Sequence, residues 1–254
     1  MALLHAALRA AGFAANLSAA PNSSEARNLH ETTSGRTHIT LLPPTPTRLS
    51  MVNEGRLRMI AAPLERGLLG WRVSFVLQDQ RRKTAGIRDL TDFQKLTVGQ
   101  GSGWIDAHIY RQAGIITREL QAWRNGEFTG QMRSGLIDVF PMGLEESVSY
   151  FLPHFRQHHP EVALDEHLLL RYPWYRFVWV TSAPEADGLY QALQDGFDVI
   201  CGNGQFESIW AADRHVPSAS HWQGRTIIKL KNPFYSQDII PQRYQHLLLD
   251  PSIS

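Results

Sequence analysis

The sequence has little that would point to a disulfide-bonded, membrane-spanning or nucleic-acid-binding protein. It has one cysteine in 254 residues, Cys201, which excludes an internal disulfide and a cysteine-based zinc site. No apolar run approaches the roughly 18–20 residues that span a bilayer, so we expect no membrane insertion. The 25 Lys and Arg residues nearly balance the 24 Asp and Glu residues, so we expect no broad basic surface for nucleic acid.

The rest of the composition is that of a globular protein with room for one large domain or two small ones. Hydrophobic residues make up 43% of the chain and charged residues 19%. Cys201 lies in an apolar, helix-like run, which favours a buried and inert thiol over a reactive one.

The N-terminal segment superficially resembles a signal peptide. However, it lacks a basic n-region, His5 and Arg9 interrupt its apolar run, and no cleavage site follows. Its apolar spacing predicts an amphipathic helix that ends at Gly12. The chain therefore shows no recognisable signal peptide.

Helical and strand-like segments alternate along the chain, which predicts an α/β fold. Ser23 or Ser24 is expected to cap a helix that runs through Glu31. Past Arg225 we expect an irregular tail. Strands are expected at 13–19, 38–42, 56–62, 71–77, 137–140, 168–171 and 174–181, and further helices at 89–95, 105–113, 118–126, 129–135, 144–158, 185–200 and 205–213.

The segment Thr97 to Trp104 is the strongest local signal. A short apolar strand leads into three glycines spaced by two, Gly99, Gly101 and Gly103, and then into a helix. Backbone N–H groups at a helix N-terminus are free to bind an anion, and the helix dipole favours negative charge there. This pattern indicates a docking point for a small carboxylate or phosphate, although glycine-rich loops also form plain tight turns.

Several weak motifs occur in an order and at spacings that resemble bacterial solute-binding protein family 3, the periplasmic receptors of amino-acid-type importers. The resemblance covers most of the chain. Its motifs are a T-x-x-R turn at Thr45-Pro-Thr-Arg48, a strand pair at 57–77, the segment 97–104, the strand Gly135-Leu-Ile-Asp138-Val-Phe, a return strand from Arg171-Tyr-Pro173 to Val180, and closing helices from Asp195-Gly196 to Trp210 with Gly204-Gln-Phe206 as G-x-[FY].

The resemblance implies a two-lobed, periplasmic-binding-protein-like fold of type II with a ligand cleft and a hinge of two crossing strands. Lobe one would comprise 1–76 and 182–254, and lobe two 77–181. The hinge strands would lie near Val73–Leu77 and Phe177–Thr181. Closure around a ligand would be a hinge motion.

The resemblance also implies the site residues. Arg48 would bind a ligand carboxylate, because a planar guanidinium can donate two hydrogen bonds to it. Gly101, Ser102 and Gly103 would bind the same carboxylate through the backbone, with Trp104 at the cleft mouth or in the core. Thr45 would donate its hydroxyl, or else cap the following helix. Trp71 would line the cleft or belong to the core, and Met142 falls where the family binds the ligand amine.

Two further groups of residues leave alternatives open. Arg72 and Arg176 lie among apolar residues, and one of them either faces the cleft or pairs with Glu65 or Asp138. His154 and His158 are four residues apart, as in many zinc sites, but adjacent prolines and the lack of a carboxylate between them favour a solvated loop. We therefore expect no metal and no cofactor.

The sequence predicts a non-catalytic, monomeric, periplasmic protein that captures a small polar or anionic solute for a membrane importer or a sensor. A standard α-amino acid is not expected, because the segment 140–143 has no acid for the ligand amine. One alternative is a ligand-free signalling or structural module, favoured by that segment and by the absence of the family's first strand, which would precede Met1. Another is a periplasmic dehydratase-type enzyme, with Glu145, Glu146 or Asp106 as its acid or base.

Overall fold

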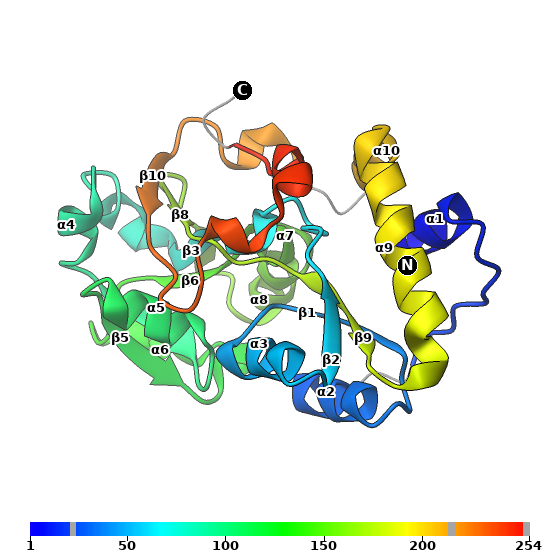
Figure 1. The fold of residues 1–254 in the computed structure, drawn as a ribbon. Coiled ribbons are helices and arrows are strands. Elements are labelled where there is room, and N and C mark those ends of the chain that lie inside the picture. The colour runs from blue at the N-terminus through cyan, green and yellow to red at the C-terminus, as the bar shows by residue number, and fades with distance from the viewer. Residues whose placement is uncertain (21–23, 213–216, 251–254) are drawn as a thin grey trace. The chain divides into compact units, whose positions relative to one another are not determined.

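The computed structural model describes residues 1–20, 24–212 and 217–250, and these residues form two compact units. Unit 1 comprises Met1–Gly67, Trp174–Val216 and Gln237–Leu249, and unit 2 comprises Leu68–Pro173, Pro217–Ser236 and Asp250–Ser254. Figure 1 labels their helices and strands. Ser23 and Asp213, which the sequence places in a helix cap and a helix end, lie outside the described residues.

Unit 1 is built on a three-stranded sheet in the order β1-β9-β2, with both pairings antiparallel. The strands consist largely of β-branched and aromatic residues, and β9 is buried along its whole length. The elements of unit 1 are α1 (Ala2–Ala10), α2 (Glu25–Thr33), β1 (Ile39–Leu42), α3 (Pro46–Asn53), β2 (Leu57–Ile60), β9 (Phe177–Thr181), α9 (Asp187–Gly202) and α10 (Gln205–Ala211).

The amphipathic N-terminal helix is confirmed as α1, which packs its buried Leu4, Ala7 and Leu8 against α9 (Figure 1). The contact is close enough to require a glycine. A Cβ atom at Gly196 of α9 would lie 2.0 Å from the Ala7 carbonyl oxygen. The absence of a side chain at this position therefore sets how closely the two helices approach.

Gly196→Ala is expected to destabilise the protein by about 1–3 kcal/mol, because backbone atoms must move to admit the methyl group. Gly202→Ala is the control in the same helix, since a Cβ there meets nothing within 4 Å. It should be neutral or slightly stabilising, because alanine favours helix over glycine. Urea unfolding of both variants tests this, and equal stabilities would contradict it.

Unit 2 contains a sheet in the order β10-β8-β3-β6, with β7 also paired to β3, and a parallel pair β4-β5 that joins β6 through a Val98–Val139 bridge. Its helices are α4 (Leu90–Phe93), α5 (Asp106–Gln112), α6 (Glu127–Arg133), α7 (Leu144–Glu146) and α8 (Leu152–His158). Its strands are β3 (Trp71–Leu77), β4 (Thr97–Gly101), β5 (Ile116–Leu120), β6 (Phe140–Gly143), β7 (Val162–Leu164), β8 (Leu168–Arg171) and β10 (Thr226–Lys229).

The two faces of this sheet differ in character. Side chains alternate along a strand, so Phe75, Phe140 and Met142 lie on one face, and they form an apolar core with helix residues such as Phe128. By register, Arg72 and Ser74 of β3 lie on the other face. The β3–β6 pair of unit 2 therefore has an apolar core on one face and buried polar groups on the other.

Four sequence predictions about local structure are wrong. The strand expected at 137–140 is instead β6 at Phe140–Gly143, because Ser74 and its neighbours in β3 pair with Pro141 and the residues that follow it. Residues 118–126 are not a helix, because Ile116–Leu120 pairs with β4 as strand β5. Residues 226–229 are not irregular, because β10 pairs in parallel with β8. Residues 13–19 form no strand. Each outcome depends on whether a neighbouring strand is present, which local sequence does not show.

The division of the chain also differs from the expected lobes. Among the described residues, strand β3 pairs with strands of unit 2 and β9 with strands of unit 1. The first two crossings of the chain are instead at Gly67–Leu68 and Pro173–Trp174. Residues 217–236 belong to unit 2, because their strand β10 is hydrogen-bonded to strand β8 of that unit.

Candidate functional site

Thr45 and Arg48 lie at the start of α3 in unit 1. The Thr45 hydroxyl accepts a hydrogen bond from the Arg48 backbone N–H at 3.3 Å, and Pro46 follows as the first helical residue. This is the geometry of a helix N-cap. The hydroxyl of Thr45 therefore has a structural role in capping, which the sequence offered as one of its two interpretations.

The Arg48 guanidinium is buried and binds a carboxylate of the chain itself. Its Nη1 donates to the Pro43 carbonyl oxygen at 2.6 Å, and its Nη2 donates to Glu25 Oε2 at 2.9 Å. The Arg48 side chain is 8% exposed, whereas that of Glu25 is 63% exposed. The remaining Nε is buried without a hydrogen-bond partner. Arg48 thus presents a largely desolvated cation with one carboxylate already in place.

The glycine segment of unit 2 also holds an anion from the chain. The Ser102 N–H donates to the Leu120 carbonyl at 2.9 Å, and the Gly103 N–H donates to Glu119 Oε2 at 2.9 Å. The Gly103 N–H, together with Arg111, lowers the pKa of Glu119 below its ordinary value. In this turn the Gly103 N–H is thus bonded to Glu119, a carboxylate of the chain itself.

Three apolar residues that the sequence placed at the site make packing contacts. The Trp104 ring covers Gly101, where a Cβ would lie 2.5 Å from the indole, and stacks edge-on against Trp123 at 4.7 Å. Met142 is 1% exposed within the apolar core of unit 2. Trp71 is also 1% exposed and meets Trp222 edge-to-face at 5.3 Å.

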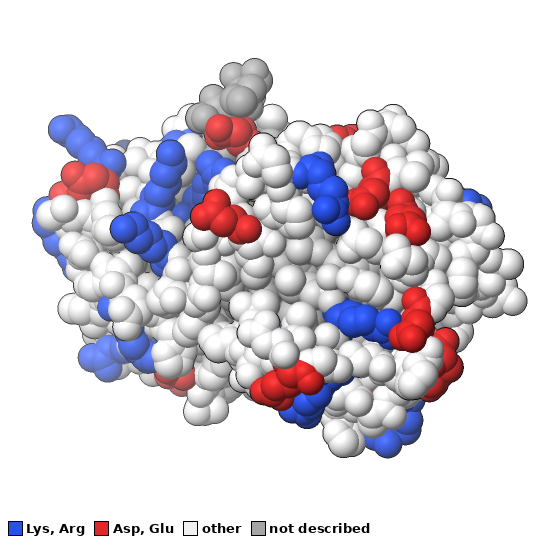
Figure 2. Space-filling view, in the orientation of Figure 1, with Lys and Arg blue, Asp and Glu red and all other residues white. Residues whose placement is uncertain are grey.

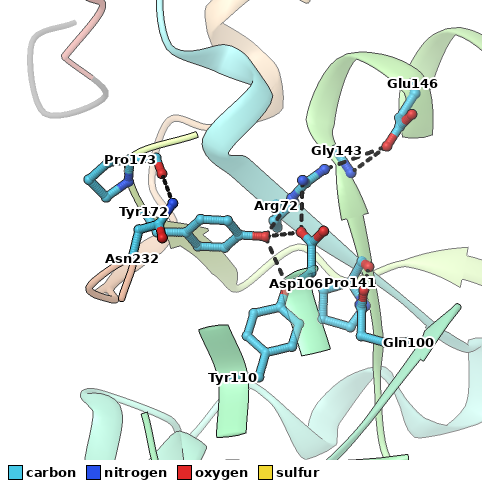
Figure 3. Close-up of polar contacts among 10 residues, drawn as sticks. All are labelled: Arg72, Gln100, Asp106, Tyr110, Pro141, Gly143, Glu146, Tyr172, Pro173 and Asn232. Atoms are coloured by element: carbon cyan, nitrogen blue, oxygen red, sulfur yellow. Dashed lines mark hydrogen bonds and ion pairs between the residues drawn. The ribbon is translucent and has the colours of Figure 1, made fainter. Parts of the chain in front are cut away.

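A buried ionic network in unit 2 is the feature that the sequence did not identify (Figure 3). Arg72 Nη2 lies 2.8 Å from Asp106 Oδ1, and Arg72 Nε donates to the Tyr172 hydroxyl at 2.8 Å. The Tyr172 hydroxyl in turn donates to Asp106. Tyr110 completes the group, with its hydroxyl 3.4 Å from that of Tyr172. The sequence placed Arg72 among apolar residues but did not name Asp106 or Tyr172 as its partner.

The electrostatics of this network follow from its burial. Burial disfavours the charge of Arg72, but Asp106 together with Tyr172, Glu146 and Tyr110 outweighs burial and raises the arginine pKa well above its usual value. Burial also raises the pKa values of Tyr172 and Tyr110, so both phenols stay protonated. The network therefore holds a buried guanidinium against a carboxyl group, with two phenols as hydrogen-bonding neighbours.

Further polar groups lie near this network without partners. Gln100 Nε2 donates to the Pro141 carbonyl at 2.7 Å, but its Oε1 is buried and unbonded, as is the Ser74 hydroxyl across the sheet. On the other side, Glu146 is 47% exposed and lies 3.5 Å from Arg72 Nη1 while it accepts from the Gly143 N–H at 3.1 Å. Asp106 and Glu146 are thus both engaged by Arg72, and neither is a free general acid or base.

Other candidates make different contacts. Arg176 pairs with Glu65 at 2.8 Å, as one of the sequence alternatives has it. The rings of His154 and His158 are 6.1 Å apart, and within the described residues no three His, Cys, Asp or Glu side chains are grouped to hold a metal. Cys201 is buried, as the sequence predicts, and burial raises the pKa of its thiol to about 12.

Unit 1 also contains a cavity of about 510 Å³ that none of the expected site residues line. It lies between the outer edge of β1 and the irregular segment that follows α1, with Ile39, Leu41 and Leu17 among its walls. On the surface, acidic and basic side chains are interspersed over much of the face shown in Figure 2. No helix in the described parts of the chain has the length and apolar character needed to cross a bilayer.

No protein-family model and no curated protein sequence matches this chain. Many solved structures are similar in fold, and the following are two of them. The GluR0 ligand-binding core complex with L-glutamate gives a TM-score of 0.53 at 12% identity, with 85% of this chain and 88% of that chain covered. The chain has a type II periplasmic-binding-protein fold. The second substrate-binding domain of a putative amino acid ABC transporter from Streptococcus pneumoniae Canada MDR_19A gives 0.50 at 13% identity, over the same shares of the two chains.

The binding-protein fold confirms the class that the sequence predicted. Arg48 belongs to unit 1 and Gly103 to unit 2. At these identities the likeness establishes the fold alone, so the function must be argued from this chain's own side chains.

Proposed function

We propose that this protein is a non-catalytic solute-binding protein that captures a small, carboxylate-bearing or polar solute for an importer or a sensor. The observation that carries the proposal is Arg48, a buried guanidinium whose Nη2 binds a carboxylate at 2.9 Å. A desolvated guanidinium offers charge-assisted hydrogen bonds to carboxylates, which are stronger than neutral ones. A solute carboxylate would take the place that Glu25 occupies.

In unit 2, we also propose the Gly103 N–H as a carboxylate-binding group. It already binds Glu119 Oε2 at 2.9 Å, so the turn has the geometry for a carboxylate oxygen. One similar structure is a ligand-binding core in complex with L-glutamate, and the other is a substrate-binding domain of a putative amino acid transporter. A carboxylate is the chemical group common to such solutes. For this chain we propose a carboxylate-bearing solute, periplasmic residence and a membrane partner.

A thermal-shift screen of the purified chain tests the proposal. The panel contains amino acids, small organic acids, amines and phosphate-bearing solutes. A solute at 100 times its dissociation constant should stabilise the native state by about 2.7 kcal/mol, which gives a measurable rise in melting temperature. A carboxylate among the hits supports the proposal. A cooperative transition that no solute shifts would contradict it.

The second candidate is a ligand-free signalling or structural module with the same fold. One specific observation favours it: Glu25 and Glu119 satisfy both anion-binding groups, so the fold needs no external anion. For such a module, the screen should give no hit. The melting temperature should also be the same with and without a high concentration of carboxylate solutes, because Glu25 and Glu119 keep their contacts.

A further inference from the structure

The Arg48–Glu25 pair is asymmetric in a way that suggests a role in binding. Arg48 is anchored: its side chain is 8% exposed and its Nη1 is fixed to the Pro43 carbonyl at 2.6 Å. Glu25 is not anchored in this way, since its side chain is 63% exposed. If the pair opens, Glu25 moves into solvent while Arg48 keeps its position.

The fold does not depend on the Glu25 side chain. Glu25 is the first residue of α2, but the cap of that helix is Ser24, whose hydroxyl accepts from the Arg27 N–H at 3.3 Å. An ion pair with one well-exposed partner contributes little to stability. The Glu25 carboxylate is therefore free to leave Arg48 at small cost to the folded state.

We infer that Glu25 is an internal competitor that occupies the Arg48 edge which a solute carboxylate must take. This inference rests on the proposed function. Solute binding exchanges the Glu25 carboxylate for a solute carboxylate on the same guanidinium. Selectivity among carboxylate solutes therefore depends on the other chemical groups of each solute. After displacement, the Glu25 carboxylate lies in solvent but remains near Arg48, and there it repels a second anionic group on the solute. Glu25 therefore selects monocarboxylates over dicarboxylates.

The test is titration calorimetry of wild type and Glu25→Gln with acetate, L-glutamate and succinate as probes. The amide has the same shape but no charge, so it competes weakly for the guanidinium. Every probe that binds should bind the variant more tightly by roughly three- to fivefold, the factor that corresponds to an exposed ion pair. The gain should be largest for succinate, because the variant also lacks the repelling charge.

Glu31→Gln is the matched control. Glu31 lies on the same helix and loses the same charge, but it pairs with Arg36 at 2.5 Å rather than with Arg48. This variant should bind all three probes as the wild type does. A general effect of net charge would instead tighten binding in both variants equally, and that result would overturn the inference.

The outcomes separate this inference from the proposed function. If the wild type binds a probe and Glu25→Gln binds it equally well or less well, Glu25 is no competitor, and the solute-binding function stands. If only Glu25→Gln binds, the inference is supported in its strongest form. If neither protein binds any of the three carboxylates, both the inference and a carboxylate-binding function fail.

Discussion

Arg72→Met is expected to lower the free energy of unfolding by about 3–5 kcal/mol, because it leaves a buried carboxylate without its counter-ion. Asp106 is 8% exposed, and its nearest cation is Arg72 at 2.8 Å. The Tyr172 hydroxyl continues to donate to Asp106, but one neutral hydrogen bond does not replace a full positive charge. Urea unfolding at neutral pH measures the loss.

The double variant Arg72→Met/Asp106→Leu distinguishes an unpaired charge from a mere packing defect. With both charges removed, the free energy of unfolding should recover much of the loss, since apolar residues often replace a buried ion pair at little cost. Arg133→Met is a surface control: its pair with Glu161 is exposed, with 61% of the arginine side chain accessible. It should change stability by about 0–1 kcal/mol. A double variant as unstable as the single one would contradict this account.

Arg48→Ala is expected to weaken binding of a carboxylate solute by about 2–5 kcal/mol, or roughly 30-fold to several thousand-fold. The reason is the loss of a buried, charge-assisted contact for which no other cation in the neighbourhood substitutes: within the described residues, Glu25 forms its ion pair with Arg48 alone. Titration calorimetry with the hits of the thermal-shift screen measures the change.

Two further variants keep this prediction interpretable. Arg48→Lys keeps the charge but lacks the planar fork, so it should bind between the wild type and Arg48→Ala. Arg56→Ala removes an exposed arginine that pairs with Glu54 at 3.3 Å near the end of the same helix, and it should bind as the wild type does. Unchanged affinity in a folded Arg48→Ala protein would remove Arg48 from the site.

Local chemistry was sufficient to predict several elements from the sequence. Thr45-Pro46 predicts a helix start because both the cap and the proline preference act within one turn, and α3 begins there. Residues 97–104 predict an anion-binding turn because glycines free the backbone N–H groups, and Gly103 binds Glu119. The amphipathic spacing of residues 1–12 predicts α1 in the same way.

The sites themselves depend on partners that are distant in sequence. Arg48 and Glu25 are 23 residues apart in the sequence, and Arg72 and Tyr172 are 100 residues apart. The sequence left open whether Arg72 faces the cleft or pairs with Glu65 or Asp138, and it could not show that Asp106 lies 2.8 Å from the guanidinium. A missed signal was Asp106 itself, an acid at the start of a helix with Ala107, Ile109 and Tyr110 buried behind it.

The sequence by itself determined the α/β class, the amphipathic helix α1 and the helix start at Thr45-Pro46, since these follow from composition, periodicity and short-range capping. Tertiary structure alone decided that residues 116–120 form a strand beside β4, that residues 226–229 pair with β8, and that Glu25 pairs with Arg48 and Glu119 with Gly103. Backbone ladders and ion pairs form between groups brought together by folding. Their energy depends on separation in space, which a linear pattern does not encode.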